Sequence, residues 1–312
     1  MNATDVQESG VHHQGLLNIF VIVLMALTGV LIVVLNPLCL IALHRASGIQ
    51  ETTKTFMASL TLSDLCGGIF YVASQLIYHI TNEWFLGDFL CILWGATISI
   101  FMTLSSISLF LLSVDRFIAV IYPLRYPTLM TPKRSKLITI LLWAATFTLY
   151  SIIHATFSES NVSRRSTSIC EYGACKFCFI IYISAMAVPL TAILLLYMHI
   201  LRVARRQARC IAAQGQINNP PGGQEAPQPI STKSTTTVFI ITGALIICWT
   251  PTIVTLFLVS RGSLSSDHIV NIIAEIMYLT NGWLNVVIYY WRNKQLRQAL
   301  HGLVSSCWHW CS

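Results

Sequence analysis

Charged side chains are scarce in this sequence. Asp, Glu, Lys and Arg make up 10% of the 312 residues, against about 25% in a soluble domain. Hydrophobic residues make up 55%, and the mean hydropathy is +0.67, so the chain lacks the polar surface that a soluble enzyme needs. The low charge and the 11% of aromatic residues also exclude an intrinsically disordered chain. The composition therefore predicts a protein whose solvent is lipid.

Seven stretches of the chain carry almost no charge. Each is 21 to 28 residues long, and about 20 apolar residues are enough to cross a bilayer core of about 30 Å. Asp64 and Glu275 are the charged residues inside them. Backbone amides in lipid must be paired within their own segment, which predicts helices rather than strands. The predicted helices are 16–43, 55–80, 89–114, 137–157, 177–201, 234–260 and 268–291.

The fold class that follows is an all-α membrane protein, a seven-transmembrane helix bundle. Residues 1–15 precede this bundle, which occupies 16–291, and residues 292–312 follow it. The amphipathic stretch 293–304 predicts a short eighth helix that lies on the membrane, before a short tail. The connection 208–232 contains a Pro- and Gly-rich run typical of a flexible linker. The sequence shows no internal repeat, which argues against transporters built from duplicated halves.

Positive charges divide unequally between the two sides of the predicted membrane. Of the 19 Lys and Arg residues, 15 flank the first, third and fifth connections or follow the last helix. Basic loops stay cytoplasmic, which predicts an outside N-terminus and an inside C-terminus. Glycosylation sequons at Asn2 and Asn161 both fall on the predicted outside. Membrane topology therefore accounts for the basic surplus, and no nucleic-acid partner is expected.

Each predicted helix carries a residue or short motif, and the whole set occurs in a recognisable order. The set is Asn36, Leu60-Thr61-Leu62-Ser63-Asp64, Cys91, Asp115-Arg116-Phe117, Trp143, Pro189 with Tyr197, Cys248-Trp249-Thr250-Pro251 and Asn285-Val286-Val287-Ile288-Tyr289. Across all seven helices this set resembles the rhodopsin-like (class A) G-protein-coupled receptors. Two positions depart from the family pattern, because Phe117 replaces the tyrosine of Asp-Arg-Tyr and Val286 replaces the proline of Asn-Pro-x-x-Tyr.

Asp64 lies at the middle of the predicted membrane. An ionisable side chain there costs at least about 2.5 kcal/mol to insert and marks a functional site. The resemblance implies the family's sodium pocket, with Ser105, Asn281 and Asn285 facing Asp64. Oxygen ligands beside one carboxylate suit a hard cation, so an allosteric sodium ion is the one cofactor expected. The alternative is a protonated carboxyl that joins two helices by a hydrogen bond.

The resemblance also implies an activation switch in the half of the bundle nearer the cytoplasm. Asp115 would hold Arg116 at the end of the third helix until Arg116 is released toward a G protein. Pro251 must interrupt the sixth helix, and Trp249 beside it could turn a ligand's shift into a helix rotation. The alternatives are a snorkelling arginine and plain core packing. The switch residues are Asp115, Arg116, Tyr197, Trp249, Pro251 and Tyr289.

Cysteines near the predicted outer face are expected to form a disulfide. Cys91 opens the third helix and Cys170 lies in the second outside loop, which is an oxidising compartment. Cys175 and Cys178 fall nearer to or within the fifth helix, whereas Cys170 leaves room for a loop strand before it, so the predicted pair is Cys91–Cys170. On the other side, two cysteines follow the amphipathic stretch and are expected to be palmitoylated. They are Cys307 and Cys311.

The resemblance narrows the choice of ligand. Leu279 stands where an opsin carries its retinal lysine, and Ile98 stands where amine receptors carry an aspartate, so neither retinal nor a typical monoamine is expected. Residues 201–207 weakly resemble adenosine and melanocortin receptors, although Leu256 replaces the asparagine that adenosine receptors use. The predicted outer cavity is mostly apolar and aromatic, which fits an extracellular small molecule or lipid. Its residues are Gln75, Tyr78, Trp94, Ile98, Ser99, Met102, Thr103, Thr252, Leu256, Asn271 and Glu275.

Glu275 is the second charge within a predicted helix. It lies ten residues before Asn285, about 15 Å toward the outside along a helix. A bare carboxylate facing lipid is implausible, which leaves three roles. Glu275 pairs with a cationic ligand, bonds Tyr78 or Gln75 on the second helix, or is protonated in an apolar pocket.

The function that follows is that of a receptor at the plasma membrane and not an enzyme. It would bind its ligand outside and activate a heterotrimeric G protein through movement of the sixth helix, with arrestin and receptor kinases as further partners and lipid around the bundle. A seven-helix transporter, channel or non-signalling scaffold is the alternative. A conducting path needs polar residues along several helices, and two charges within the seven helices are too few.

Overall fold

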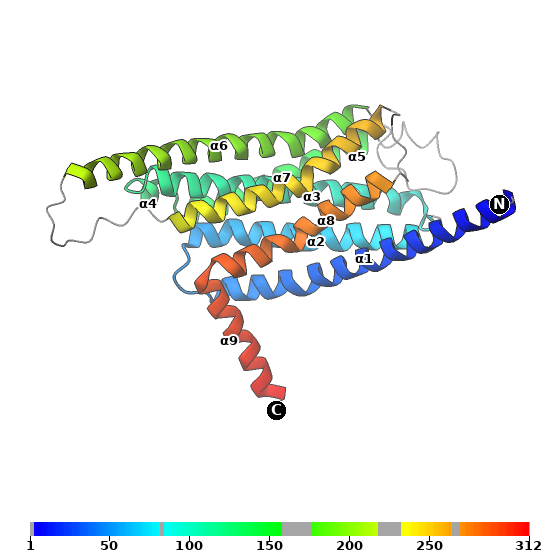
Figure 1. Ribbon diagram of the computed structural model, residues 1–312, viewed down its shortest axis with the longest axis horizontal. Coiled ribbons are helices and arrows are strands. Elements are labelled where there is room, and N and C mark those ends of the chain that lie inside the picture. Colours follow the sequence, from blue (N-terminus) through cyan, green and yellow to red (C-terminus); the bar gives the residue numbers. More distant parts are fainter. Residues whose placement is uncertain are drawn as a thin grey trace.

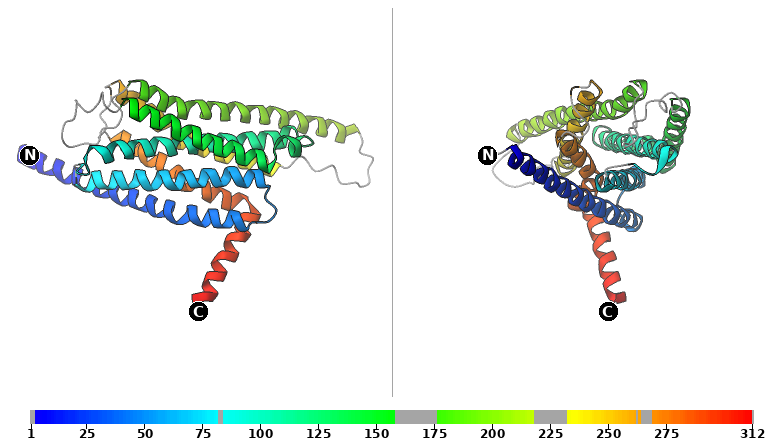
Figure 2. Two further views of the ribbon diagram at one scale, coloured as in Figure 1. Left: turned by 180° about the vertical axis from the view of Figure 1, so that it is seen from behind. Right: turned by 90° about the vertical axis from the view of Figure 1, so that its right-hand side faces the viewer.

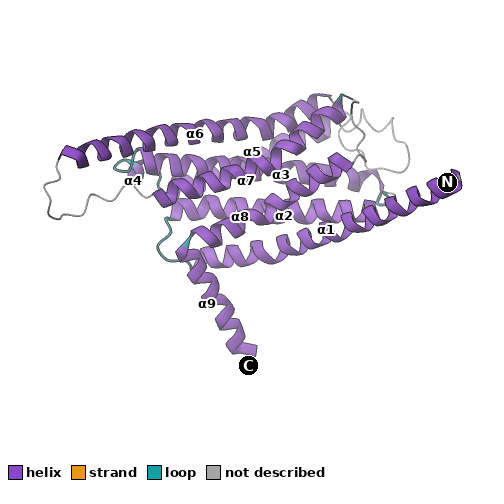
Figure 3. Ribbon diagram, in the orientation of Figure 1, coloured by secondary structure: helices purple, strands orange, loops and turns teal. Residues whose placement is uncertain are grey.

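The computed structural model of the protein describes residues 3–81, 84–157, 176–217, 232–261, 263 and 269–311. These residues are helical apart from short turns, and none of them forms a strand (Figure 3). The predicted all-α fold is therefore confirmed. The helices are α1 (Ala3–Arg45), α2 (Glu51–Thr81), α3 (Gly87–Ile121), α4 (Tyr126–Leu129), α5 (Pro132–Phe157), α6 (Lys176–Ile217), α7 (Thr232–Ser260), α8 (Ile269–Arg292) and α9 (Lys294–Cys311).

The long helices α1 to α3 and α5 to α8 run side by side along one axis (Figure 1). α3 packs against α2, α5 and α6, and α8 packs against α1, α2 and α7. α9 leaves the bundle at the end opposite the N-terminus and points away from it (Figure 2). We call the half of the bundle next to α4 and the start of α9 the inner half, and the other half the outer half.

The surface of the bundle is apolar. Among the described residues, six helices are long and apolar enough to cross a membrane. α7 has 29 residues, and its apolar stretch is Gly243–Leu258. Large hydrophobic side chains point outward, and Val188 and Leu195 on α6 are each 65% exposed. Lipid rather than water is the solvent that such a surface requires.

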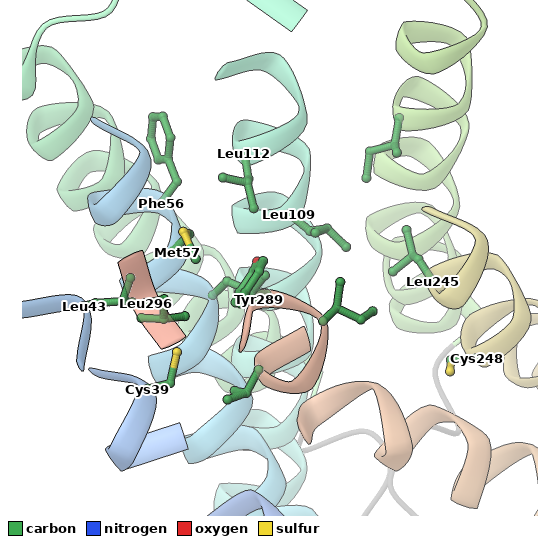
Figure 4. Packing of buried hydrophobic residues seen from close by; sticks show 14 of the residues in the cluster. Cys39, Leu43, Phe56, Met57, Leu109, Leu112, Leu245, Cys248, Tyr289 and Leu296 are labelled. Carbon is green, nitrogen blue, oxygen red and sulfur yellow. The ribbon is translucent and has the colours of Figure 1, made fainter. Parts of the chain in front are cut away.

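The largest hydrophobic core cluster of the described residues is concentrated in the inner half. Figure 4 shows part of this cluster from close by. It joins α1, α2, α3, α6, α7, α8 and α9, and its members include Leu43, Phe56, Leu109, Tyr289 and Leu296. Leu296 and Leu303 belong to this cluster, so the apolar face of α9 is held where α9 meets the bundle. This packing fixes the inner ends of the helices relative to one another.

Several helices extend past the predicted membrane segments. α6 continues to Ile217, into the predicted connection 208–232, and α1 begins at Ala3 rather than at residue 16. Ala, Arg and Gln are abundant in the added part of α6 and favour helix. The short helix α4 was not predicted, because four residues leave no periodic pattern in a sequence. The thickness of the membrane sets the minimum length of a spanning helix. Residues with high helix propensity beyond the membrane then extend the helix further.

Candidate functional site

Asp64 lies on α2 and is buried at the meeting of three helices. Ser105 Oγ on α3 donates to Asp64 Oδ1 at 2.5 Å. Asn285 Nδ2 on α8 donates to Asp64 Oδ2 at 3.0 Å. Each carboxylate oxygen thus has a donor from a different helix. The structure brings three of the four residues predicted for the sodium pocket into direct contact.

A small cavity adjoins the Asp64 carboxylate. Asp64, Ser105 and Asn281 are among its lining residues, and it offers about 20 Å³ to the centre of a water-sized sphere. A bound water needs roughly 10–15 Å³ by this measure. The cavity therefore has room for about one water molecule or small ion. Its carboxylate, hydroxyl and amide oxygens are hard donors, and the residues present fit a small hard cation.

Small residues let the helices approach one another closely around this cavity. Gly67, Gly68 and Gly282 line it. A Cβ atom on Gly68 would lie 2.8 Å from the Ile32 side chain, and one on Gly282 would lie 3.3 Å from it. Asn36 Nδ2 also donates to the carbonyl of Gly282 at 3.0 Å. α1 is thereby held against both α2 and α8 at the depth of Asp64.

Two tyrosines line the outer side of the cavity. Tyr71 on α2 and Tyr278 on α8 each lie seven residues outward of Asp64 and Asn285, and their ring centroids are 6.1 Å apart. The Tyr278 ring lies 5.8 Å from the ring of Trp249. The Trp249 indole N–H has no hydrogen-bond partner among the described residues. Neither tyrosine was predicted from the sequence, because an aromatic residue in an apolar helix resembles ordinary membrane packing.

Asp115 and Arg116 at the inner end of α3 form a second polar cluster. Asp115 is fully buried, and its Oδ2 is 2.6 Å from Arg116 Nη2. Thr53 on α2 donates to Asp115 Oδ2 at 2.8 Å, and Tyr126 on α4 donates to Oδ1 at 2.7 Å. Arg116 also donates to the Thr53 hydroxyl. We call these four residues the inner lock, because they tie α2, α3 and α4 together.

Tyr126 is the member of the inner lock that lies outside the membrane segments. Its hydroxyl also shares a hydrogen bond of 2.7 Å with Thr52. Burial, reinforced by Asp115, raises the pKa of Tyr126 above its usual range. Tyr126 therefore stays protonated and able to donate at cellular pH. Thr53 and Tyr126 were not predicted, since they stand 62 and 11 residues from Asp115 in the sequence.

The remaining predicted switch residues also lie on helices α6, α7 and α8. Tyr197 OH on α6 is 2.8 Å from Ser113 Oγ on α3. Tyr289 is part of the inner core cluster, and its buried hydroxyl has no partner within the described part of the chain. Pro251 lies inside α7, two residues after Trp249. The predicted switch is thus spread over four helices that pack together.

Three hydroxyl residues predicted to face the outer cavity are buried and bonded within the protein. Ser99 Oγ donates to the Gly95 carbonyl at 2.8 Å. Thr103 Oγ1 is 2.7 Å from Tyr150 OH, and Thr252 Oγ1 donates to the Ala274 carbonyl at 2.9 Å. Thr252 thereby joins α7 to α8 one residue before Glu275.

Other predicted cavity residues lie on α2, α3 and α7. Trp94 Nε1 donates to the Phe70 carbonyl at 2.5 Å, and Met102 Sδ accepts a bond of 2.6 Å from Tyr182. Gln75 bonds Tyr71 within α2. Ile98 packs against the main core cluster, and Leu256 is partly buried. Tyr78 lies on α2, but its side chain is outside the described part of the structure.

Glu275 and Asn271 occupy successive turns of α8. Asn271 Nδ2 donates to Glu275 Oε1 at 3.0 Å, and Asn271 is buried. Glu275 also interacts electrostatically with Tyr71 and Tyr182. The bond to Asn271 was not among the roles that the sequence suggested for Glu275. It holds one carboxylate oxygen in a fixed orientation.

The predicted modification sites fall mostly outside the described residues. Cys91 is disulfide-bonded, whereas its predicted partner Cys170 lies outside the described residues. The same holds for the sequon residues Asn2 and Asn161. Cys307 and Cys311 belong to α9, with side chains outside the described part. The pairing, the glycosylation and the palmitoylation stay predictions.

Comparison with known proteins places this architecture in a family. A family model described as 7 transmembrane receptor (rhodopsin family) matches residues 35–289. The chain is 30% identical to the histamine H2 receptor of Cavia porcellus over 269 residues, which cover 82% of this chain and 71% of the relative. It is 25% identical to the alpha-1A adrenergic receptor of Oryzias latipes, over 91% of this chain and 65% of the relative. It is 26% identical to the octopamine receptor beta-2R of Chilo suppressalis, over 90% and 77%.

The relatives are receptors and not enzymes. This confirms the predicted receptor family and the prediction that the protein is not an enzyme. The family match covers the motifs from Asn36 to Tyr289. The apolar helices and these relatives also make the chain a multi-pass membrane protein. The chain belongs to the rhodopsin-like family of G-protein-coupled receptors.

Proposed function

We propose that this receptor binds an extracellular small molecule among the outer ends of α2, α3, α7 and α8 and activates a heterotrimeric G protein at its inner face. The inner lock is the observation that carries this proposal. It holds Arg116 on a fully buried carboxylate, with Tyr126 and Thr53 as further donors. Such a closed cluster can be opened by a change elsewhere in the bundle.

A series of contacts connects the outer half of the bundle to the inner half, and a conformational change caused by the ligand could pass through them. Thr252 ties α7 to the α8 backbone beside Glu275. Tyr278 packs on Trp249, and Pro251 follows two residues later in α7. Pro251 removes one backbone hydrogen bond, which makes α7 bend more easily there. A ligand that shifts α8 or Trp249 would therefore move the inner end of α7, and this movement is the proposed signal.

Asp64, Ser105, Asn281 and Asn285 would hold an allosteric sodium ion. The ion would supply a positive charge to the Asp64 carboxylate between α2, α3 and α8. Asp64 and its donors lie between Tyr278 and the inner core cluster, so they bridge the two halves of the bundle. An uncompensated carboxylate at this depth is costly, which supports a bound cation.

The proposed orientation places the N-terminus outside and α9 in the cytoplasm. The excess of basic residues at the inner ends supports it. Arrestin and receptor kinases would then meet the inner face. Cys307 and Cys311 would anchor α9 to the membrane if they are palmitoylated. The pair Cys91–Cys170 and glycans on Asn2 and Asn161 would lie outside.

A cell-based test of G-protein activation examines this function directly. Cells expressing the full chain are compared with cells expressing Arg116→Ala at equal surface density. We expect constitutive activation of at least one G-protein class by the unchanged chain and its loss in Arg116→Ala. Lys136→Ala, which removes an exposed basic side chain at the start of α5, should keep the signal. Equal signals from the chain and Arg116→Ala would contradict the proposal.

A further inference from the structure

The outer half of the bundle contains a carboxylate that interacts with tyrosines of two neighbouring helices. Glu275 lies on α8, and its Oε1 is fixed by Asn271 at 3.0 Å. Tyr71 from α2 and Tyr182 from α6 are close enough to interact with it electrostatically. Tyr278 lies one turn inward on α8, and its ring centroid is 6.1 Å from that of Tyr71, with the ring planes inclined at 58°. Three helices therefore bring aromatic groups to one negative charge.

This combination favours an organic cation over other ligands. A carboxylate away from bulk water attracts a positive charge more strongly than the same group in water. Aromatic rings add attraction for an ammonium or guanidinium group near their faces. Apolar surface next to the carboxylate would match the carbon skeleton of an amine. An anionic ligand would be repelled by Glu275.

α3 offers no comparable charge at this depth among its described side chains. Ile98 is apolar, and Ser99 bonds its own helix at Gly95. The acidic residue with a described side chain in α3 is Asp115, which lies at the inner end and is held by Arg116. At the depth of Glu275, a cation would therefore meet a carboxylate on α8, whereas the described side chains of α3 offer none there.

We infer that Glu275 binds the ammonium group of a small organic amine, with the rings of Tyr71, Tyr182 and Tyr278 beside it. This inference rests on the proposed function and names the ligand class of the same site. Asn271 is a positioning residue, because it orients Glu275 through Oε1. The ring centroids of Tyr278 and Trp249 are 5.8 Å apart. An amine bound at Glu275 would therefore be connected through the Tyr278 ring to Trp249, which precedes Pro251 in α7.

The test measures binding to the full receptor purified in lipid nanodiscs, without a G protein. The probes are phenethylamine, histamine and octopamine, together with 2-phenylethanol, which matches phenethylamine in shape but lacks the ammonium group. We expect at least one amine to raise the unfolding temperature, and phenethylamine to exceed 2-phenylethanol. Glu275→Gln should weaken amine binding at least about tenfold, which corresponds to about 1.4 kcal/mol.

Two further variants show whether a loss of amine binding comes from the lost charge of Glu275, from its changed shape or from impaired folding. Glu275→Asp keeps the charge and should restore most of the binding lost in Glu275→Gln. Glu51→Gln removes a glutamate at the inner end of α2, paired with Lys54 at 2.9 Å, and should leave amine binding unchanged. The inference would be overturned if Glu275→Gln left the binding of every amine unchanged. It would also be overturned if none of the three amines bound to the unchanged receptor.

Failure of this inference and failure of the proposed function give different results. Constitutive G-protein activation that depends on Arg116, without any amine binding, would leave the proposed function standing and reject the amine. Glu275-dependent amine binding without G-protein activation would support the amine site and reject the signalling function.

Discussion

The inner and outer halves of the bundle place their carboxylates in different surroundings. In the inner half, Asp115 is paired with the cation of the next residue and receives two hydroxyl donors from α2 and α4. In the outer half, the described donor to Glu275 is a neutral amide one turn away, with tyrosines nearby. The described contacts of Asp115 thus include a cation, whereas those of Glu275 are with a neutral amide and with tyrosines.

This difference separates what the receptor shares with its family from what is its own. Arg116, Trp249 and Tyr289 match the family motifs, and all lie where helices pack into one core or lock. Ile98 departs from the amine-receptor pattern, and it lies in the same outer half as Glu275. The residues proposed for signalling thus match the family motifs, whereas the proposed ligand contacts do not follow the amine-receptor pattern. The following changes test each half of the comparison.

The largest effect is expected from Asp115→Asn, which keeps the shape of the side chain but removes its charge. Breaking one side of a buried ion pair costs several kcal/mol, although the Arg116 side chain is 27% exposed. We therefore expect basal G-protein activation to rise at least about tenfold, or about 1.4 kcal/mol. The measurement is basal second-messenger output per receptor at the cell surface.

Glu51→Gln provides the matched control for this change. Its ion pair with Lys54 is exposed, and exposed pairs contribute little. Basal output should stay at the level of the unchanged receptor. A rise in Glu51→Gln equal to that in Asp115→Asn would show that loss of any inner carboxylate is enough, and the inner lock would lose its special role.

A smaller effect is expected from Tyr126→Phe. This change removes one hydrogen bond to Asp115 and leaves Arg116 and Thr53 in place. One hydrogen bond contributes about 1 kcal/mol, so basal output should rise about fivefold. Tyr122→Phe alters an exposed tyrosine nearby and should change nothing. If Tyr126 acts through Asp115, adding Tyr126→Phe to Asp115→Asn should raise the output no further, and an additive rise would contradict this.

The site at Asp64 is expected to give the smallest change. Sodium chloride should raise the unfolding temperature of the purified receptor by about 2–4 °C, for about 1 kcal/mol of binding energy. An equal concentration of choline chloride is the control for ionic strength. Asp64→Asn removes the carboxylate and should abolish the difference between the two salts. A sodium effect that persists in Asp64→Asn would place the cation elsewhere.

The helices could be predicted from the sequence because a membrane imposes a simple rule. A run of about 20 residues without charge has few alternatives to a spanning helix, and each predicted run lies within an observed helix or differs from it by one residue at its start. The positions at which the helices end do not depend on the membrane alone. The extension of α6 to Ile217 depends on the propensity of its polar residues, which hydropathy does not measure.

Site residues could be predicted from the sequence where their type is unusual for the segment in which they lie. Asp64 stands out because an acid is rare in an apolar helix, and its donors Ser105 and Asn285 follow from the family motifs. Tyr126 and Thr53 do not stand out, since polar residues are common at helix ends. Their role depends on α2, α3 and α4 meeting at Asp115, and this meeting is a property of the packed bundle.

The most direct test of the inner lock measures nucleotide exchange on purified heterotrimeric G proteins. The receptor in lipid nanodiscs is compared with Asp115→Asn and with the double variant Asp115→Asn/Arg116→Ala. We predict that Asp115→Asn speeds exchange at least about tenfold over the unchanged receptor, and that the double variant returns exchange to the rate of the G protein alone. Equal exchange with and without Arg116 in the Asp115→Asn background would contradict the account.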